Sequence, residues 1–248
     1  MMSDQPRVSE IEADPHEERT LYGRRKGKKL RVRQSHLVSD LLPSLALDPA
    51  VQIADPRDLF PAAVDAVRME IGFGGAEHLV AEAARQPGIG FIGCEPFVNG
   101  VAKLLVQIDE RGLQNIRVHH GDARQILQRL PDGRLDRVDV LYPDPWPKWR
   151  QRKRRFLSTD NLYEIARVLR PGGVLRVATD IDDYAGWVLA RVAHMDELSW
   201  SARAAGDWLT PWPHWPGTRY EAKAYREGRA PVYLEFTRSG GAASGSTP

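Results

Sequence analysis

The segment VRMEIGFGGAEHLVAEAARQPGIGFIGCEP, residues 67–96, decides the fold of this chain. Its first part, residues 67–73, is an apolar run that leads into a glycine-rich turn, as a buried strand would. Residues 77–86 then repeat apolar side chains at helical spacing, and a second apolar run follows at residues 88–96. Strands that alternate with helices of about ten residues predict a parallel sheet with helices on its faces.

The same alternation continues along the chain. Further helices are predicted at residues 97–112, 123–130, 159–173 and 183–195. Further strands are predicted at residues 116–123, 137–144, 173–180, 198–205 and 231–238. We therefore expect an α/β fold with a doubly wound, mostly parallel, seven-stranded Rossmann-like sheet and helices on both faces. The last two strands have no crossover helix between them, so the C-terminal strand is expected to be an antiparallel edge strand.

The chain of 248 residues is 42% apolar, which is enough for one sizeable core. We expect four segments: a disordered acidic tail (1–20), a basic arm with a short helix (21–50), the α/β domain (51–238) and a flexible tail (239–248). Two basic runs, at residues 22–34 and 148–155, favour a nucleic acid as partner. The single cysteine and the lack of a long apolar run indicate a cytoplasmic protein that does not associate with membranes.

An acidic residue lies at or near the end of five of the predicted strands. They are Glu70, Glu95, Asp122, Asp144 and Asp180. In a doubly wound sheet, ligands bind outside the carboxyl ends of the strands, so these acids are expected to converge on one crevice. A single aspartate at such a point is more often a helix cap, but five at equivalent points favour a binding site.

The acidic crevice also indicates which cofactor would bind there. The turn GFGGAE has Glu77 where a dinucleotide fingerprint needs glycine, and the chain contains no P-loop motif. Acids repel phosphate but suit a cofactor with an ammonium, a sulfonium, a ribose diol and an amine, as in S-adenosylmethionine. We expect Glu95 to accept the ribose hydroxyls, Asp122 the adenine amine, and Glu70 to lie near the methionine end.

The segment LYPDPWPKWRQRKRR, residues 141–155, follows the fourth strand of the predicted core. Asp144 stands between two prolines, which restrict the backbone and should hold the carboxylate in place. Trp146 and Trp149 could stack on an exposed base or pack the loop against the sheet, and the sequence leaves both interpretations open. The basic residues that follow would hold the phosphates of an RNA.

Seven motifs occur in the order found in bacterial tRNA (guanine-N7-)-methyltransferases. They are MEIGFGG, IGCEP, GDA, YPDPWPKWRQRKRR, LRPGG, ATD and TRYE, and the chain resembles this family over roughly residues 20–238. The resemblance implies a class I methyltransferase fold and the methylation of guanine 46 in the tRNA variable loop, with S-adenosylmethionine as cofactor. One departure is Ala76, because many members have glycine at that point of the turn.

The resemblance also implies roles for individual residues. The implied cofactor residues are Glu70, Gly72, Gly74, Glu95, Asp122, Ala123 and Asp144, of which Asp144 is also the implied catalytic residue. The implied substrate residues are Lys148, Asp180, Thr218, Arg219, Tyr220 and Glu221. The implied RNA-binding residues are Arg150, Gln151, Arg152, Lys153, Arg154 and Arg155.

Three other functions are compatible with parts of the sequence. A methyltransferase for adenine or cytosine amino groups would have a second proline where Trp146 stands. An RNA-binding module without catalysis would have no use for the acids, and a nicotinamide oxidoreductase is disfavoured by Glu77. No HExxH motif or Cys/His cluster occurs, so no metal is expected, and the oligomeric state, monomer or homodimer, stays open.

Overall fold

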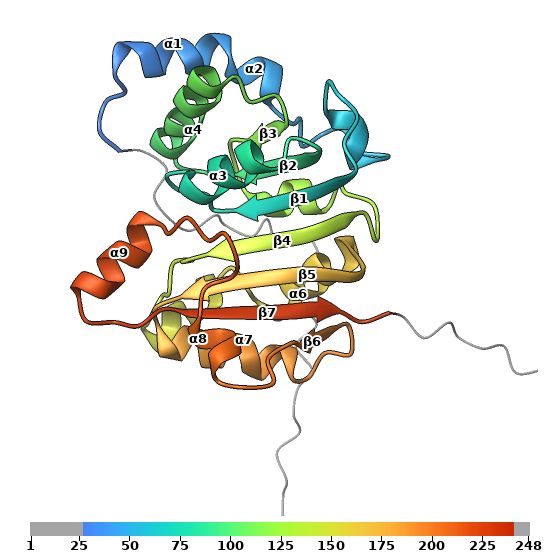
Figure 1. Cartoon of the computed structure of the whole chain (residues 1–248), viewed down its shortest axis with the longest axis vertical. Coiled ribbons are helices and arrows are strands. Elements are labelled where there is room, and N and C mark those ends of the chain that lie inside the picture. The colour runs from blue at the N-terminus through green and yellow to red at the C-terminus, as the bar shows by residue number, and fades with distance from the viewer. Residues whose placement is uncertain (1–26, 241–248) are drawn as a thin grey trace, which may run out of the picture.

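The computed structural model describes residues 27–240, and their centre is one seven-stranded sheet (Figure 1). The strands are β1 (Ala66–Ile71), β2 (Ile89–Cys94), β3 (Ile116–His119), β4 (Leu135–Leu141), β5 (Leu169–Thr179), β6 (Leu198–Trp200) and β7 (Val232–Arg238). Their order is β3-β2-β1-β4-β5-β7-β6, with β1 to β5 parallel and β7 antiparallel to both of its neighbours. The chain reverses its direction of winding between β1 and β4, which is where such sheets bind ligands.

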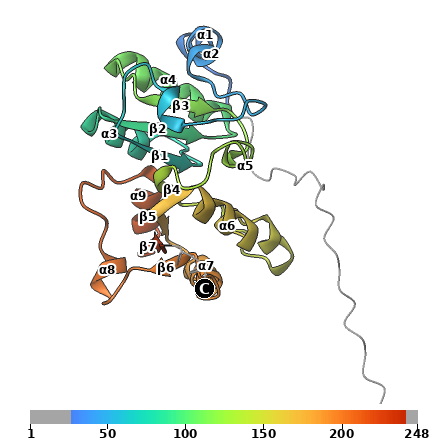
Figure 2. The ribbon, with the colours of Figure 1, turned by 90° about the vertical axis from the view of Figure 1, so that its right-hand side faces the viewer.

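Helices cover both faces of the sheet (Figure 2). The α-helices are α1 (Val32–Asp40), α2 (Leu42–Leu45), α3 (Glu77–Arg85), α4 (Val98–Arg111), α5 (Ala123–Leu127), α6 (Thr159–Val168), α7 (Asp182–Val192), α8 (Gly206–Leu209) and α9 (Arg219–Arg226). Two 3₁₀ helices, η1 (Pro56–Leu59) and η2 (Trp149–Arg154), complete the described elements. Helices α3 and α4 lie on one face and α5, α6 and α7 on the other. None of the helices within residues 27–240 is both long and apolar enough to cross a membrane.

Each face of the sheet has its own apolar core, because each packed helix buries one stripe of side chains. The core under α3 and α4 contains Leu79, Leu104 and Leu105, all inaccessible to solvent. The core under α5, α6 and α7 is larger and contains Leu162 and Val188. The buried residues recur at helical spacing along each helix, which is why the sequence pattern identified these helices.

The structure confirms the predicted fold class and corrects several boundaries. Helix α6 ends at Val168 instead of residue 173, and the Pro-Gly-Gly that we expected to end it lies inside β5. The sixth strand covers only residues 198–200. The C-terminal strand is antiparallel, as expected, but it lies one position in from the edge, because β6 pairs with its outer side. Residues 1–26 and 241–248, which include the predicted acidic tail and most of the flexible tail, lie outside the described residues.

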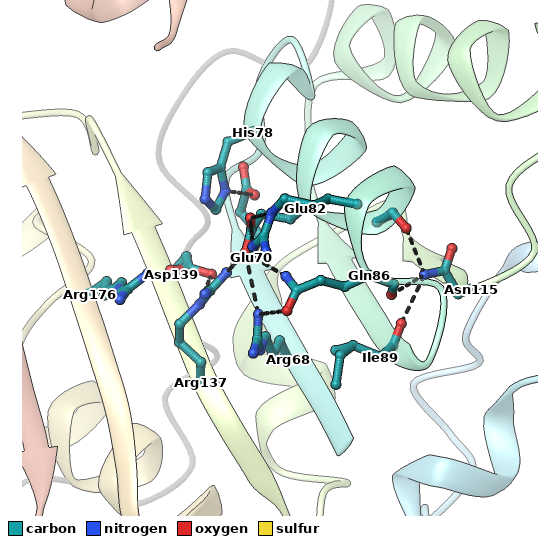
Figure 3. A network of polar contacts seen from close by, with 12 residues as sticks. Arg68, Glu70, His78, Glu82, Gln86, Ile89, Asn115, Arg137, Asp139 and Arg176 are labelled. Atoms are coloured by element: carbon teal, nitrogen blue, oxygen red, sulfur yellow. Dashed lines mark hydrogen bonds and ion pairs between the residues drawn. The ribbon is translucent and has the colours of Figure 1, made fainter. Parts of the chain in front are cut away.

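A network of charged side chains is buried where α3 crosses β1 and β4 (Figure 3). The guanidinium of Arg137 on β4 donates to Asp139 at 2.9 Å and to Glu82 of α3 at 2.7 Å. Arg68 of β1 donates to the same carboxylate of Glu82 at 3.3 Å. Side chains of Arg137, Asp139 and Glu82 are each less than 10% exposed. The network joins the strand that carries the glycine turn to the strand that leads to Asp144.

Candidate active site

One cavity of about 1340 Å³ opens at the carboxyl ends of β1, β2 and β4. Most of the predicted cofactor residues line it, namely Gly72, Gly74, Glu95, Asp122, Ala123 and Asp144. The other side of the same cavity is lined by basic residues of η2 and by residues of α6 and α7. The cavity therefore has an acidic end at the sheet and a basic end beyond the turn that carries Asp144.

The glycine-rich turn after β1 forms the floor of the acidic end. Gly72 and Gly74 have φ angles of 73° and 52°, in the left-handed region that glycine adopts without strain. Ala76, which caps α3, also has a left-handed φ, of 65°, and its side chain is buried. An alanine in this conformation costs roughly 1–2 kcal/mol, so glycine would be the less strained residue at this position.

Glu95, the residue after β2, is held by two backbone amides. Its Oε2 accepts a hydrogen bond from the Gly74 N–H at 2.7 Å, and its Oε1 accepts one from the Phe97 N–H at 2.9 Å. Burial raises the pKa of this carboxyl, and the two amide hydrogen bonds act in the opposite direction. Each carboxylate oxygen keeps a further lone pair, so Glu95 can still accept two hydroxyl groups from the cavity side.

Asp122 is the N-cap of α5, which is the structural role that we weighed against cofactor binding. Its Oδ1 accepts from the backbone N–H of Arg124 at 3.0 Å, and its Oδ2 accepts from the Arg124 side chain at 2.9 Å. The residue lines the cavity all the same. A cofactor amine would therefore share this carboxylate with Arg124.

Asp144 differs from the other acids of the cavity because it is exposed and its carboxylate has no side-chain partner. No hydrogen bond or ion pair joins it to any side chain in residues 27–240. Loss of water at the cavity wall raises the pKa of this carboxyl above its usual range. The turn around it is strained, since Tyr142 and Trp146 have φ angles of 50° and 40°. A carboxylate held this way, without a partner, is available to a ligand.

Glu70 is directed away from the large cavity. It is buried, and its Oε2 lies 2.7 Å from Nδ1 of His78 (Figure 3). Burial raises the pKa of Glu70, and the nearby His78 opposes that rise. Glu70 lines a separate small cavity with Gly72, Tyr142 and Thr218. A direct contact between Glu70 and a cofactor therefore remains a prediction.

The predicted substrate residues fall into two groups. Tyr220 lines the cavity, and its ring lies 6.3 Å from that of Tyr142, centroid to centroid. Arg219 donates to Glu77 at 2.8 Å, which fastens α9 over the glycine turn. Lys148 is exposed just before η2 and is absent from the cavity wall. Tyr220 and Tyr142 line the cavity in which a base could lie, whereas Arg219 and Lys148 do not.

The other three predicted substrate residues make internal contacts. The Thr218 hydroxyl caps α9 by accepting from the Glu221 N–H at 3.1 Å. Glu221 is buried, and it accepts from Trp215 Nε1 at 2.9 Å and from the Tyr233 hydroxyl. Asp180 accepts from Arg229 at 2.6 Å. Contacts between these residues and a substrate stay predictions.

Most of the basic run 150–155 lies in η2, and two of its arginines lie over the rings of Trp146 and Trp149. Arg154 lies 4.9 Å from the centre of the Trp146 ring, and Arg152 lies 5.2 Å from that of Trp149. Trp149 is 79% exposed, so its other side is open to a stacking partner. The exposure of Trp149 contradicts packing of this ring against the sheet, and stacking of either ring on a base stays a prediction.

Arg155 is buried, unlike its neighbour Lys153, and its predicted contact with RNA stays a prediction. Its side chain is 0% exposed, and it pairs with Asp183 and donates to the carbonyl of Pro145 at 2.8 Å. The rings of Tyr184 and Trp187 lie on its sides, 5.2 Å and 5.3 Å from its guanidinium carbon. A guanidinium enclosed in this way would contact an RNA only if the packing around it opened. It anchors the turn that holds Asp144.

Two substitutions separate the structural arginine from its exposed neighbour. We expect Arg155→Met to lower the free energy of unfolding by roughly 2–3 kcal/mol, because charged hydrogen bonds are lost in a buried setting. Lys153→Met should change it by less than about 0.5 kcal/mol, because that side chain is exposed. Urea unfolding of both variants checks this. An Arg155→Met protein as stable as the unmodified chain would contradict the structural role of Arg155.

Several cavity residues were not anticipated. Pro96 and Phe97 follow Glu95 directly, and Tyr142 lies within the proline-rich segment, so the neighbouring motifs could have indicated all three. Trp187 and Arg191 of α7 carry no motif, and only the tertiary structure brings them to the cavity. Within residues 27–240, no group of three or more His, Cys, Asp or Glu side chains is arranged to hold a metal.

Comparisons with known proteins agree with this architecture. A solved 16S rRNA methyltransferase, KamB, superposes with a TM-score of 0.52 at 18% identity, covering 71% of this chain and 89% of that protein. A mutant of the 16S rRNA (adenine(1408)-N(1))-methyltransferase from Catenulisporales acidiphilia gives 0.50 at 16% identity, with 78% and 92% covered. At this level of identity the likeness concerns the fold alone, which is that of class I methyltransferases.

Sequence comparisons identify a closer group of relatives. A family model described as "Putative methyltransferase" matches residues 64–234. A tRNA (guanine-N(7)-)-methyltransferase of Rhizobium meliloti (strain 1021) is 52% identical over 221 residues, which cover 88% of this chain and 94% of that protein. The enzyme of the same name from Agrobacterium fabrum (strain C58) is 51% identical over 220 residues, with the same coverage. This chain therefore belongs to the bacterial tRNA (guanine-N7-)-methyltransferase family.

Proposed function

We propose that this protein transfers a methyl group from S-adenosylmethionine to N7 of a guanine in tRNA, at position 46 of the variable loop. The observation that carries the proposal is a single cavity with an acidic end, a basic end and the unpaired carboxylate of Asp144 between them. The acidic end suits a cationic cofactor, and the basic end suits an RNA. The names of the relatives supply the tRNA and the guanine N7.

The acidic end fits S-adenosylmethionine. Glu95 keeps lone pairs for two ribose hydroxyls, Asp122 and Ala123 begin α5 beside the adenine position, and Gly72 and Gly74 leave room for the methionine end. Glu70 is assigned to the methionine end through the small cavity that it shares with Gly72. When bound, the cofactor supplies an electrophilic methyl group on a positively charged sulfur.

The residues of the chain then have to align the base with the methyl group and stabilise the charge that develops during transfer. Guanine N7 carries a lone pair and no proton, so no residue has to act as a general base. Positive charge develops on the purine as the methyl group arrives, and we assign to the Asp144 carboxylate, which lines the cavity, the role of stabilising this charge or of accepting from the amino edge of the base. Tyr220 can stack on the base, while Lys148, Asp180, Thr218, Arg219 and Glu221 are proposed as further substrate contacts.

The reaction is tested with unmodified tRNA and labelled S-adenosylmethionine, followed by mapping of the modified base. We expect one label per tRNA, on N7 of guanine 46. Label on an adenine or cytosine amino group would point to the related amino-methyltransferase chemistry and overturn this proposal. The absence of transfer, together with tight RNA binding, would support a binding module instead.

The basic residues of η2 should make tRNA binding strongly dependent on salt. Arg150, Arg152, Lys153 and Arg154 line the cavity with guanidinium or ammonium groups. About four phosphate contacts would reduce tRNA affinity by roughly 100-fold between 50 and 200 mM salt. Filter binding over a salt series measures this, and an affinity that stays level would contradict the assignment of the run. A cytoplasmic location and tRNA as partner are part of the same proposal.

A further inference from the structure

Arg191 on α7 lies in the basic end of the cavity, outside every motif that identified the family. It stacks on the ring of Trp187, one turn earlier in the helix, with its guanidinium carbon 3.4 Å from the ring centre. Its Nη1 also donates to the backbone carbonyl of Trp187 at 3.0 Å. The guanidinium is therefore held flat against the tryptophan, with its orientation fixed from one side.

No carboxylate within residues 27–240 neutralises Arg191. Its neighbours Arg152 and Arg155 both pair with Asp183, at the first turn of the same helix. Arg191 has no ion pair of this kind, although it is only half exposed. Its burial and the charge of Arg155 both lower the pKa of Arg191, because each of them destabilises the charged form of its guanidinium.

A guanidinium has five N–H donors, and Arg191 uses one of them in the hydrogen bond to Trp187. The remaining donors form a planar fork of the kind that binds phosphate through two parallel hydrogen bonds. The stacked tryptophan fixes the fork in advance, so little side-chain entropy is lost on binding. These features describe a site built to receive an anion.

We propose that Arg191 binds a backbone phosphate of the RNA next to the nucleotide that enters the cavity. A nucleotide that places its base beside Asp144 must carry its own phosphates into the same cavity, and Arg191 lines that cavity beyond η2. The site would position the RNA backbone without reading sequence. This inference rests on the proposed function, since it needs an RNA substrate.

The test compares Arg191→Gln with a matched loss of charge at Arg134. Arg134 is exposed beside the start of β4, at the opposite end of the sheet from the cavity. We expect Arg191→Gln to weaken tRNA binding about tenfold at low salt. The slope of log affinity against log salt should fall by about 0.7–0.9, the value for one phosphate. Arg134→Gln should change neither quantity, and calorimetry should give unchanged cofactor affinity for both variants.

A second variant and a second anion complete the experiment. Arg191→Lys keeps the charge but not the planar fork. The slope of log affinity against log salt should therefore equal that of the unmodified protein, while part of the tRNA affinity stays lost. Inorganic phosphate alone is then tested for its effect on thermal stability. Stabilisation by free phosphate that is lost in Arg191→Gln, without any change in tRNA affinity, would show a small-anion site and overturn the inference.

Equal affinities and slopes for Arg191→Gln and Arg134→Gln would also overturn the inference about Arg191. If the unmodified protein binds tRNA without dependence on salt, the failure lies with the proposed RNA contacts as a whole. The two failures can therefore be told apart by the behaviour of the unmodified protein.

Discussion

Asparagine in place of Asp144 is expected to lower kcat for methyl transfer by about 10²- to 10³-fold. The substitution keeps the size and polarity of the side chain but removes the negative charge that would face the developing cation on guanine. Asp144 makes no hydrogen bond or ion pair with other residues in 27–240, so its loss should not disturb the fold. Single-turnover methylation of tRNA measures the effect on the chemical step alone.

Calorimetry with S-adenosylmethionine is the control for the Asp144→Asn protein. Cofactor affinity should change far less than kcat, because Glu95 and Asp122 also line the acidic end. Full methyl transfer together with normal cofactor affinity would contradict the role of Asp144. A loss confined to cofactor affinity would place the carboxylate on the cofactor and not on the base.

The pH dependence of the reaction gives a second readout for Asp144. The pKa of this carboxyl is raised, so the folded protein holds its proton more tightly than the unfolded chain does. Activity should therefore fall on acidification at a higher pH than for an ordinary aspartate, and the Asn variant should lack this limb. Stability should fall as the pH rises through the same window, so the Asn variant should be at least as stable as the unmodified protein at neutral pH.

Arg137→Met should lower the free energy of unfolding by about 3–5 kcal/mol. The substitution leaves Asp139 and Glu82 charged and buried without their shared partner (Figure 3). Arg85→Met is the matched control, because Arg85 pairs with the same Glu82 but is 40% exposed, and it should cost less than about 1 kcal/mol. Urea unfolding measures both variants. Similar losses of stability in Arg137→Met and Arg85→Met would show that burial of the Arg137 ion pairs contributes little to the free energy of unfolding.

The pH dependence of stability tests the same network. Burial raises the pKa of Glu82, but hydrogen bonds from Arg85 and Arg137 outweigh it and bring the pKa to about 2. The contribution of Glu82 to stability is then complete above its unfolded pKa and is lost as the pH falls toward about 2. In Arg137→Met the folded pKa of Glu82 should be less depressed, so this loss should be smaller and should end at a higher pH. An acid transition at the same pH in both proteins would contradict the proposed coupling.

The periodic spacing of apolar residues was sufficient to predict the fold class from the sequence. Helices α3 and α4 have regular apolar faces, and the alternation of such helices with apolar strands defines a doubly wound sheet. The boundaries were less accurate where two signals compete. The Pro-Gly-Gly at residues 171–173 is a typical helix terminator, but the paired strands β4 and β5 take it into the sheet through an irregular register. The helix in TRYE was missed because the segment around it is rich in proline and tryptophan.

The sequence by itself determined three of the acids that line the acidic end of the cavity, because in a parallel sheet each strand delivers its last residues to the same edge. Glu95, Asp122 and Asp144 could be placed there from spacing alone. Only the tertiary structure decided how each charge is used. Arg155 and Lys153 lie in one basic run, yet the side chain of Arg155 is enclosed by Tyr184 and Asp183, whereas that of Lys153 is exposed. Burial and pairing depend on what packs around a side chain, and residues far away in the sequence supply that packing.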